Sequence, residues 1–204
     1  AFLVNGWGWR DRAILALGKA KAYDDLSIRF PMVHNDLAQK YAAKRNLDIA
    51  DIYSIIRTES AFMTDARSPA GALGLMQLMP ATGRETARRV GARLKNVREL
   101  LEPTKNIMLG SAYLQQVLGS FGGSFSLAAA AYNAGPSHVK SWLPKSGCVP
   151  ADIWIDTIPF TETRRYVRRA AFYATVYQWR LHQEITPLAA RLTDAVPKGG
   201  NQKC

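Results

Sequence analysis

The sequence has little cysteine and no long apolar run. Its two cysteines, Cys148 and Cys204, are too few for a disulfide framework and lack the spacing of a zinc site. No stretch of about 18 apolar residues occurs, so we expect no transmembrane helix. Apolar residues make up 48% of the 204 residues, which argues against disorder and allows a core without metal or disulfide staples. We therefore expect one sizeable globular domain, or one domain with a short extension.

Acidic residues are few compared with basic ones. Lys and Arg total 27 against 16 Asp and Glu, which gives a net charge of +11. Such a field favours nucleic acid, anionic lipid or an acidic polysaccharide as partner. The basic residues form two groups at helical spacing, for which a solvated helix face is the simplest interpretation. The groups are Arg84, Arg88, Arg89, Arg93, Lys95 and Arg98, and Arg164, Arg165, Arg168 and Arg169. No zinc finger, RNA-binding aromatic signature or basic zipper is present, which weakens the nucleic-acid interpretation.

Hydrophobic periodicity predicts an almost entirely helical chain. Helices are predicted over 10–22, 34–45, 48–60, 80–90, 104–118, 124–134 and 161–184, with a last short one from 186. The segments 24–32, 64–74 and 144–159 are predicted to be connectors, and 73–79 is open as a short strand. The expected fold is mainly α, with about eight helices around a central Ala-rich helix and at most a small β-hairpin.

The helix that begins at Asp48 carries the first candidate for chemistry. Ile52, Ile56 and Glu59 fall at i, i+4 and i+7, which places Glu59 on the apolar stripe. Glu59 also stands in the last turn, where the helix dipole disfavours negative charge. Burial and dipole both raise the pKa of a carboxyl group, which is how a general acid is made. The alternative is a structural glutamate bonded to a neighbouring backbone group or to Arg57, and this motif alone does not decide between them.

Three later segments combine polar groups with unusual backbone. In SPAGALGLMQLMP (68–80), glycines let the backbone approach a ligand and Gln77 is a polar anchor, although core filling explains the methionines equally well. In AAAAYNAGP (128–136), Tyr132 and Asn133 stand at a helix end. In IPFTETRRYV (158–167), Glu162 stands just inside a helix start, where it could simply complement the helix dipole.

Together these segments resemble the lytic transglycosylases of glycoside hydrolase family 23. The resemblance rests on RTES, GLMQLMP, AYNAG and IPFTETRRYV, in that order and spacing over residues 57–167. Within the family the chain is similar to the C-terminal catalytic part of the large soluble murein enzymes, and the resemblance is weakest after about 185. It implies that 1–33 ends the linker region of a larger protein, whose N-terminal α-superhelix is missing here. It implies that 34–204 is a lysozyme-like α+β catalytic domain.

The resemblance implies cleavage of the β-1,4 bond between N-acetylmuramic acid and N-acetylglucosamine in peptidoglycan, with a 1,6-anhydromuramoyl product. Glu59 matches the catalytic residue, which protonates the glycosidic oxygen and then takes the proton of the muramic C6 hydroxyl as that hydroxyl attacks C1. One carboxyl group suffices because the two transfers are sequential and the 2-acetamido group replaces a second carboxylate. RTES departs from the commoner RQES at Thr58, from which we expect no consequence.

The resemblance also implies substrate-binding positions in a glycan cleft. These match Ser68, Gln77, Met79, Tyr132, Asn133 and Glu162. Tyr132 matches a tyrosine whose hydroxyl lies near the catalytic carboxyl, and Glu162 an acidic residue that binds glycan or stem peptide. The implied partners are glycan strands and stem peptides, whose free carboxylates suit a basic surface, and no nucleic acid, metal or cofactor is expected. The implied location is the periplasm, either free or attached to the outer membrane.

Two alternative functions stay open. A goose-type lysozyme hydrolyses the same bond, and Asp65 is the nearest acidic residue that could take a hydrolytic role. A non-catalytic glycan- or nucleic-acid-binding module would not need the full set of motifs.

The two cysteines suit an oxidising compartment such as the periplasm. Cys148 stands in a Pro/Gly-rich loop and Cys204 at the chain end, so a bond between them would tie down two segments that would otherwise be mobile. It would close a loop of about 55 residues, for which the chain-entropy model gives roughly 4 kcal/mol. Two unpaired cysteines are the alternative.

Overall fold

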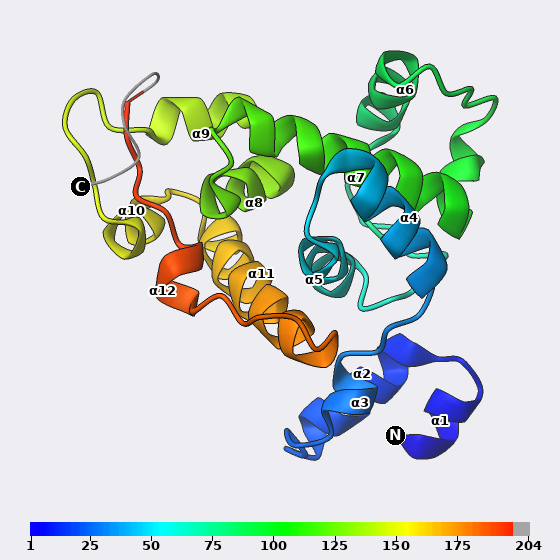
Figure 1. Cartoon of the computed structure of the whole chain (residues 1–204). Coiled ribbons are helices and arrows are strands. Elements are labelled where there is room, and N and C mark those ends of the chain that lie inside the picture. Colours follow the sequence, from blue (N-terminus) through cyan, green and yellow to red (C-terminus); the bar gives the residue numbers. More distant parts are fainter. Residues whose placement is uncertain (198–204) are drawn as a thin grey trace. The chain divides into compact units, whose positions relative to one another are not determined.

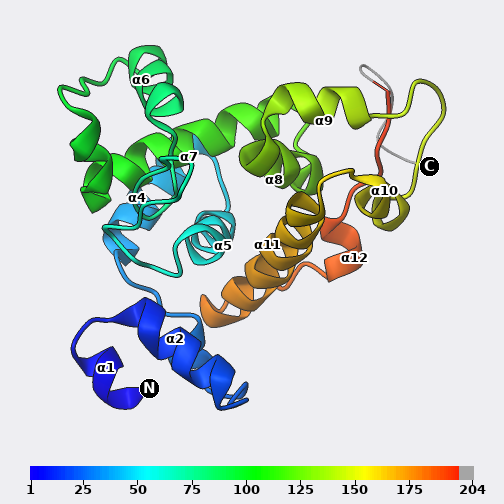
Figure 2. The same cartoon turned by 180° about the vertical axis from the view of Figure 1, so that it is seen from behind.

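The structure is a computed structural model that describes residues 1–197, and it confirms a mainly helical fold (Figures 1 and 2). The helices of this part of the chain are α1 (Phe2–Gly6), α2 (Arg10–Lys19), α3 (Leu26–Arg29), α4 (Asn35–Arg45), α5 (Ile49–Glu59), α6 (Pro80–Arg89), the 3₁₀ helix η1 (Val97–Leu101), α7 (Pro103–Ser120), α8 (Phe125–Ala134), α9 (Pro136–Trp142), α10 (Ala151–Thr157), α11 (Thr161–Arg180) and α12 (Leu188–Arg191). Over the same residues, β-structure is confined to isolated bridges that join Arg67 to Leu73, Leu73 to Leu78 and Val149 to Ala195.

The chain divides into two compact units, Ala1–Tyr113 and Leu114–Cys204, each with its own packing. In the first unit, α2 packs against α1 and α3, and Ala13, Leu17 and Ile28 form a small core. Helix α5 packs against α4 and begins where the Asp48 carboxylate accepts a hydrogen bond from Ala50 N at 2.9 Å. Such a cap satisfies one of the amides that a helix start leaves unpaired.

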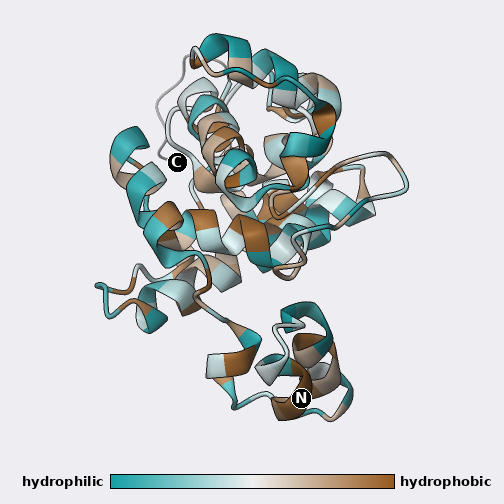
Figure 3. Cartoon of the chain, turned by 90° about the vertical axis from the view of Figure 1, so that its right-hand side faces the viewer, coloured by the Kyte–Doolittle hydropathy of each residue, from teal (hydrophilic) through white to brown (hydrophobic). Residues whose placement is uncertain are grey.

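The second unit is built on the Ala-rich helix α8. Ser124 caps its start by accepting from Leu127 N, and every residue from Phe125 to Tyr132 is buried. Helix α8 packs against α9 and α11, which confirms the predicted central helix. A helix that is apolar on all sides must be enclosed in this way. Colouring by hydropathy shows that outer helices of the chain carry both apolar and polar residues (Figure 3).

Several local predictions differ from the structure, and short helices account for most of them. Helix α3 lies inside the expected connector 24–32, because Asp25 caps it by accepting from Ile28 N at 3.1 Å. Helix α10 lies inside the expected connector 144–159, and α11 ends at Arg180 rather than near 184. The segment 73–79 is a tight turn closed by one Leu73–Leu78 pair, not a strand. A helix of one or two turns carries too few apolar residues to show a period, so caps decide it.

Two predictions made from the sequence stay predictions. The boundary between 33 and 34 stays a prediction. The Cys148–Cys204 bond also stays a prediction, because Cys204 lies outside the described residues. Over residues 1–197, no helix is both long and apolar enough to cross a membrane. Over the same range, no group of three or more His, Cys, Asp or Glu side chains is placed to hold a metal ion.

Candidate active site

Glu59 is the last residue of α5 and is half-buried. The apolar residues that lead up to it, Ile52, Ile55 and Ile56, are at most 1% exposed, as the periodicity predicts. The chain then turns sharply, because Ala61 and Phe62 both adopt the left-handed conformation with φ of 49° and 71°. Two consecutive non-glycine residues in this region are strained and persist only where the surroundings hold them.

The turn after Glu59 is held by packing and by hydrogen bonds. Phe62 is 5% exposed, and its ring lies 6.2 Å from that of Tyr53 on the helix itself. Its backbone N–H donates to Ser60 Oγ at 3.1 Å. The backbone at Glu59 is therefore held between a buried helix and a packed turn. This rigidity suits a group that must transfer protons at a fixed point.

The two residues before Glu59 on α5 each make a hydrogen bond to a backbone carbonyl. Arg57 Nε donates to Arg29 O at 2.8 Å, and its guanidinium carbon lies 5.6 Å from the ring centre of Phe30. The Thr58 hydroxyl donates to Ser54 O at 2.7 Å, within the same helix. Because Thr58 satisfies its hydroxyl locally, nothing in the structure speaks against the expectation that this departure from RQES has no consequence.

Ser68 and Gln77 lie in one compact loop. Ser68 Oγ accepts from Ala72 N at 2.9 Å, and Ser68 N donates to Ala72 O at 3.0 Å, so Ser68 closes the tip of the loop. Gln77 has a φ of 44°, and its Nε2 donates to Gly74 O at 2.8 Å and to Ala66 O at 3.2 Å. The amide nitrogen of Gln77 is thus used to hold the loop. If Gln77 anchors a ligand as predicted, its Oε1 is the atom that would accept a hydrogen bond from that ligand.

Met79 stands at the exit of the loop. It precedes Pro80, which occupies the first turn of α6, and its side chain is 42% exposed. In contrast, Met76 is 0% exposed. Of these two methionines of GLMQLM, one is therefore core and the other is available to a ligand.

Tyr132 and Asn133 lie in the last turn of α8 in the second unit. Tyr132 is 8% exposed, whereas Asn133 is half-buried. Asn133 Oδ1 accepts from the hydroxyl of Thr163 at 2.7 Å. This bond fixes which way the amide group faces and leaves Asn133 Nδ2 as a donor. The sequence analysis did not single out Thr163, although it stands inside the IPFTETRRYV motif, directly after Glu162.

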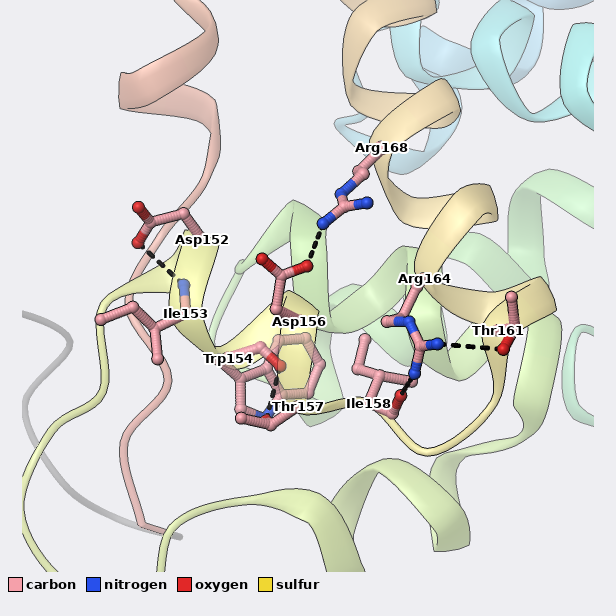
Figure 4. A network of polar contacts seen from close by, with 9 residues as sticks. All are labelled: Asp152, Ile153, Trp154, Asp156, Thr157, Ile158, Thr161, Arg164 and Arg168. Atoms are coloured by element: carbon pink, nitrogen blue, oxygen red, sulfur yellow. Dashed lines mark hydrogen bonds and ion pairs between the residues drawn. The ribbon is translucent and has the colours of Figure 1, made fainter.

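Glu162 is exposed in the first turn of α11. The start of this helix is tied to the preceding segment, as Figure 4 shows: Arg164 donates to Ile158 O and to Thr161 Oγ1, and Arg168 pairs with Asp156. Glu162 lies near the positive end of the dipole of α11, which favours a carboxylate there whether or not it binds a ligand. A substrate-binding role for Glu162 remains a prediction.

The predicted residues thus fall into two sets. Glu59, Ser68, Gln77 and Met79 belong to the first unit, and Tyr132, Asn133 and Glu162 to the second. Within the first unit the loop brings Ser68 and Gln77 together, and within the second the bond from Thr163 connects the ends of the Tyr132–Asn133 and Glu162 motifs.

Comparisons with known proteins agree with this set of motifs. A family model described as "Transglycosylase SLT domain" matches residues 36–155. The soluble lytic murein transglycosylase of Escherichia coli strain K12 is 36% identical over 184 residues, which are 89% of this chain and 28% of that protein.

Solved structures give the same result. The lytic transglycosylase Slt of Pseudomonas aeruginosa, determined as an inactive Glu-to-Gln variant, matches with a TM-score of 0.88 and 46% identity over 91% of this chain and 30% of its own. The 70-kDa soluble lytic transglycosylase of E. coli matches with a TM-score of 0.80 and 32% identity over 90% of this chain and 29% of its own. The chain spans less than a third of the length of these relatives. On the family model and the 36% identity, the chain belongs to the transglycosylase SLT domain family.

Proposed function

We propose that this chain is the catalytic part of a peptidoglycan lytic transglycosylase of glycoside hydrolase family 23. It cleaves the β-1,4 bond between N-acetylmuramic acid and N-acetylglucosamine and leaves a 1,6-anhydromuramoyl end. The observation that carries the proposal is Glu59, half-buried at the end of α5 and followed by a strained turn, in a chain with all four motifs of the family. The inactive Glu-to-Gln variant of the Pseudomonas relative supports an essential glutamate in such an enzyme.

Glu59 acts first as an acid and then as a base. Its protonated carboxyl donates to the glycosidic oxygen, the bond from that oxygen to muramic C1 breaks, and the electron pair leaves with the N-acetylglucosamine part. The 2-acetamido group stabilises the charge that develops at C1. The carboxylate of Glu59 then takes the proton of the C6 hydroxyl as its oxygen bonds to C1. No water is consumed, so the carboxyl group returns to its starting state.

The other motif residues bind the substrate. Ser68, Gln77 and Met79 contact the sugars on one side, with the Oε1 of Gln77 as an acceptor and the exposed Met79 as an apolar surface. Tyr132 and Asn133 also bind the substrate, and Glu162 binds glycan or stem peptide. The excess of basic residues favours a polymer whose peptides carry free carboxylates.

The location that follows from this substrate is the periplasm, with the protein free or attached to the outer membrane. Relatives include soluble enzymes and an endo-type membrane-bound one from Klebsiella pneumoniae. In that oxidising compartment we propose a Cys148–Cys204 disulfide. Titration of thiols in the unreduced, denatured protein tests it, and two free thiols per chain would refute the bond.

Mass spectrometry of the products from purified sacculi tests the proposed reaction. A lytic transglycosylase gives anhydromuramoyl products that are one water lighter than the products of hydrolysis. Reducing ends in their place would show a goose-type lysozyme activity, and Asp65→Asn would then show whether Asp65 takes part. Binding to sacculi with no turnover at all would show a glycan-binding module.

A further inference from the structure

A buried asparagine on α7 connects this helix to the loop that carries Gln77. Asn106 is 0% exposed. Its Oδ1 accepts from Met76 N at 2.7 Å, and its Nδ2 donates to Leu73 O at 2.9 Å and to Leu100 O at 2.7 Å. Two of these three partners lie in the loop, and the third, Leu100, lies in the 3₁₀ helix η1. One side chain therefore joins three segments of the first unit.

The loop packs closely around Asn106. A Cβ at Gly74 would lie 2.3 Å from Leu100 O and 2.5 Å from Asn106 Nδ2, so only glycine fits. One turn further along α7, a Cβ at Gly110 would lie 2.4 Å from Met76 Sδ. Asn106 and Gly110 thus form one face of α7, on which Asn106 binds the polar groups of the loop and Gly110 admits the side chain of Met76.

Only an amide fits the hydrogen bonds at this position. An amide supplies an acceptor and two donors, as the three backbone groups require. An aspartate would retain the acceptor and lose the donors, and an apolar residue would remove all three hydrogen bonds, although Leu73 O would still accept from Leu78 N. Each buried group left without a partner costs about 1–3 kcal/mol. Gln77 follows Met76 directly and Met79 lies three residues beyond it, so a displaced loop would move both.

We propose that Asn106 is a positioning residue for glycan binding. It contacts no sugar itself, and it sets the place of Gln77 and Met79 by holding the backbone of Leu73 and Met76. This inference rests on the proposed function, since it concerns the glycan site of that enzyme. It predicts that a substitution at Asn106 weakens substrate binding more than a control substitution that also lowers stability.

Asn106→Asp tests the inference, with Ser111→Ala as the matched control. Ser111 lies on the same helix, is 0% exposed, and accepts from Arg45 Nε at 3.1 Å without touching the loop. The probe is a tetrasaccharide of alternating N-acetylglucosamine and N-acetylmuramic acid. Both variants should unfold at a lower temperature than the unmodified chain. Only Asn106→Asp should raise KM, by about tenfold, with a smaller change in kcat.

A second variant covers the case in which Asn106→Asp does not fold. Gly110→Ala retains Asn106 but forces Met76 to shift, and it should raise KM by a few-fold. An unchanged KM in a folded Asn106→Asp, or in Gly110→Ala if the former does not fold, would overturn the positioning role. If the unmodified chain gives no anhydromuramoyl product, the proposed function fails. The affinity for the same tetrasaccharide, measured by calorimetry, then tests the role of Asn106. A weaker affinity in Asn106→Asp than in Ser111→Ala supports the positioning role, and an equal affinity overturns it.

Discussion

The two units hold their motif residues by different means. In the first unit, these residues stand at a helix end and in an irregular loop, with Ala61, Phe62 and Gln77 in the left-handed conformation. In the second unit, they stand in the last turn of α8 and the first turn of α11, both regular helices. The loop depends on a buried amide that lies 30 residues away from Met76 in the sequence, whereas α8 and α11 depend mainly on apolar packing.

The two kinds of support differ in how much the position of a motif residue depends on any one contact. A helix end can be placed by many small apolar contacts, no one of which is decisive. A strained loop is placed by a few hydrogen bonds, each of which fixes a direction. We therefore expect single substitutions in the first unit to be more damaging than comparable ones in the second. The following experiments test this contrast in order of expected effect.

Glu59→Gln should have the largest effect, because it removes the proton donor and acceptor without altering either scaffold. Turnover should fall by at least about 10²–10⁴-fold. The far-ultraviolet circular dichroism, the unfolding temperature and the tetrasaccharide affinity should stay close to those of the unmodified chain. Glu102→Gln, at an exposed glutamate of the same unit, is the control and should leave turnover unchanged. Near-normal turnover in Glu59→Gln would remove Glu59 from the mechanism.

Gly74→Ala should come next, with Gly71→Ala as its control. Both glycines lie in the loop at positive φ, +76° and +91°, but an added Cβ meets backbone only at Gly74. Gly71→Ala should lower the free energy of unfolding by about 1–2 kcal/mol through the left-handed backbone alone. Gly74→Ala should lower it by about 1–3 kcal/mol more, because the chain must shift to relieve the contact. Equal losses, measured by denaturant titration, would show that the loop is looser than its packing indicates.

Thr163→Val should have a smaller effect in the second unit. The substitution keeps the shape of a side chain that is 1% exposed and removes its hydrogen bond to Asn133. We expect a loss of about 1 kcal/mol in the free energy of unfolding and a few-fold fall in kcat. Thr175→Val on the same helix removes a bond to Ala171 O and should leave kcat unchanged. A fall in kcat as large as that of Glu59→Gln would contradict the contrast between the units.

The sequence predicts helix α8 and the start of α11 in the second unit better than it predicts the loop of the first, and for a physical reason. Helices α8 and α11 follow from Ser124, Gly135 and the apolar period, which are local signals. The loop of the first unit follows from Asn106, whose partners Leu73 and Met76 lie far from it in the sequence, and no local pattern marks such a bond. Glu59 stands out in the sequence because the apolar stripe and a helix end coincide there, and the structure places it half-buried at the end of α5. Thr163 was missed because its partner Asn133 belongs to a motif 30 residues away.

His34→Asn should give the smallest effect, visible only as a pH dependence. Burial lowers the pKa of His34, with Asp36 opposing the shift, so the folded state favours the neutral imidazole. The unfolded chain takes up a proton near pH 6.5, so the free energy of unfolding falls as the pH drops from there through the lower folded-state pKa. Above about pH 6.5 this contribution is fully present.

The comparison of His34 with His182 makes this test specific. Both residues have a left-handed backbone, with φ of 56° and 55°, but His34 is half-buried in the first unit and His182 is exposed in the second. Asn tolerates this conformation at both positions. His34→Asn should flatten the slope of the free energy of unfolding between pH 7 and pH 5, a slope bounded by about 1.4 kcal/mol per pH unit for one proton. His182→Asn is the control for replacing an exposed histidine at a left-handed position. If the two variants changed the slope equally, burial of His34 would not be its cause.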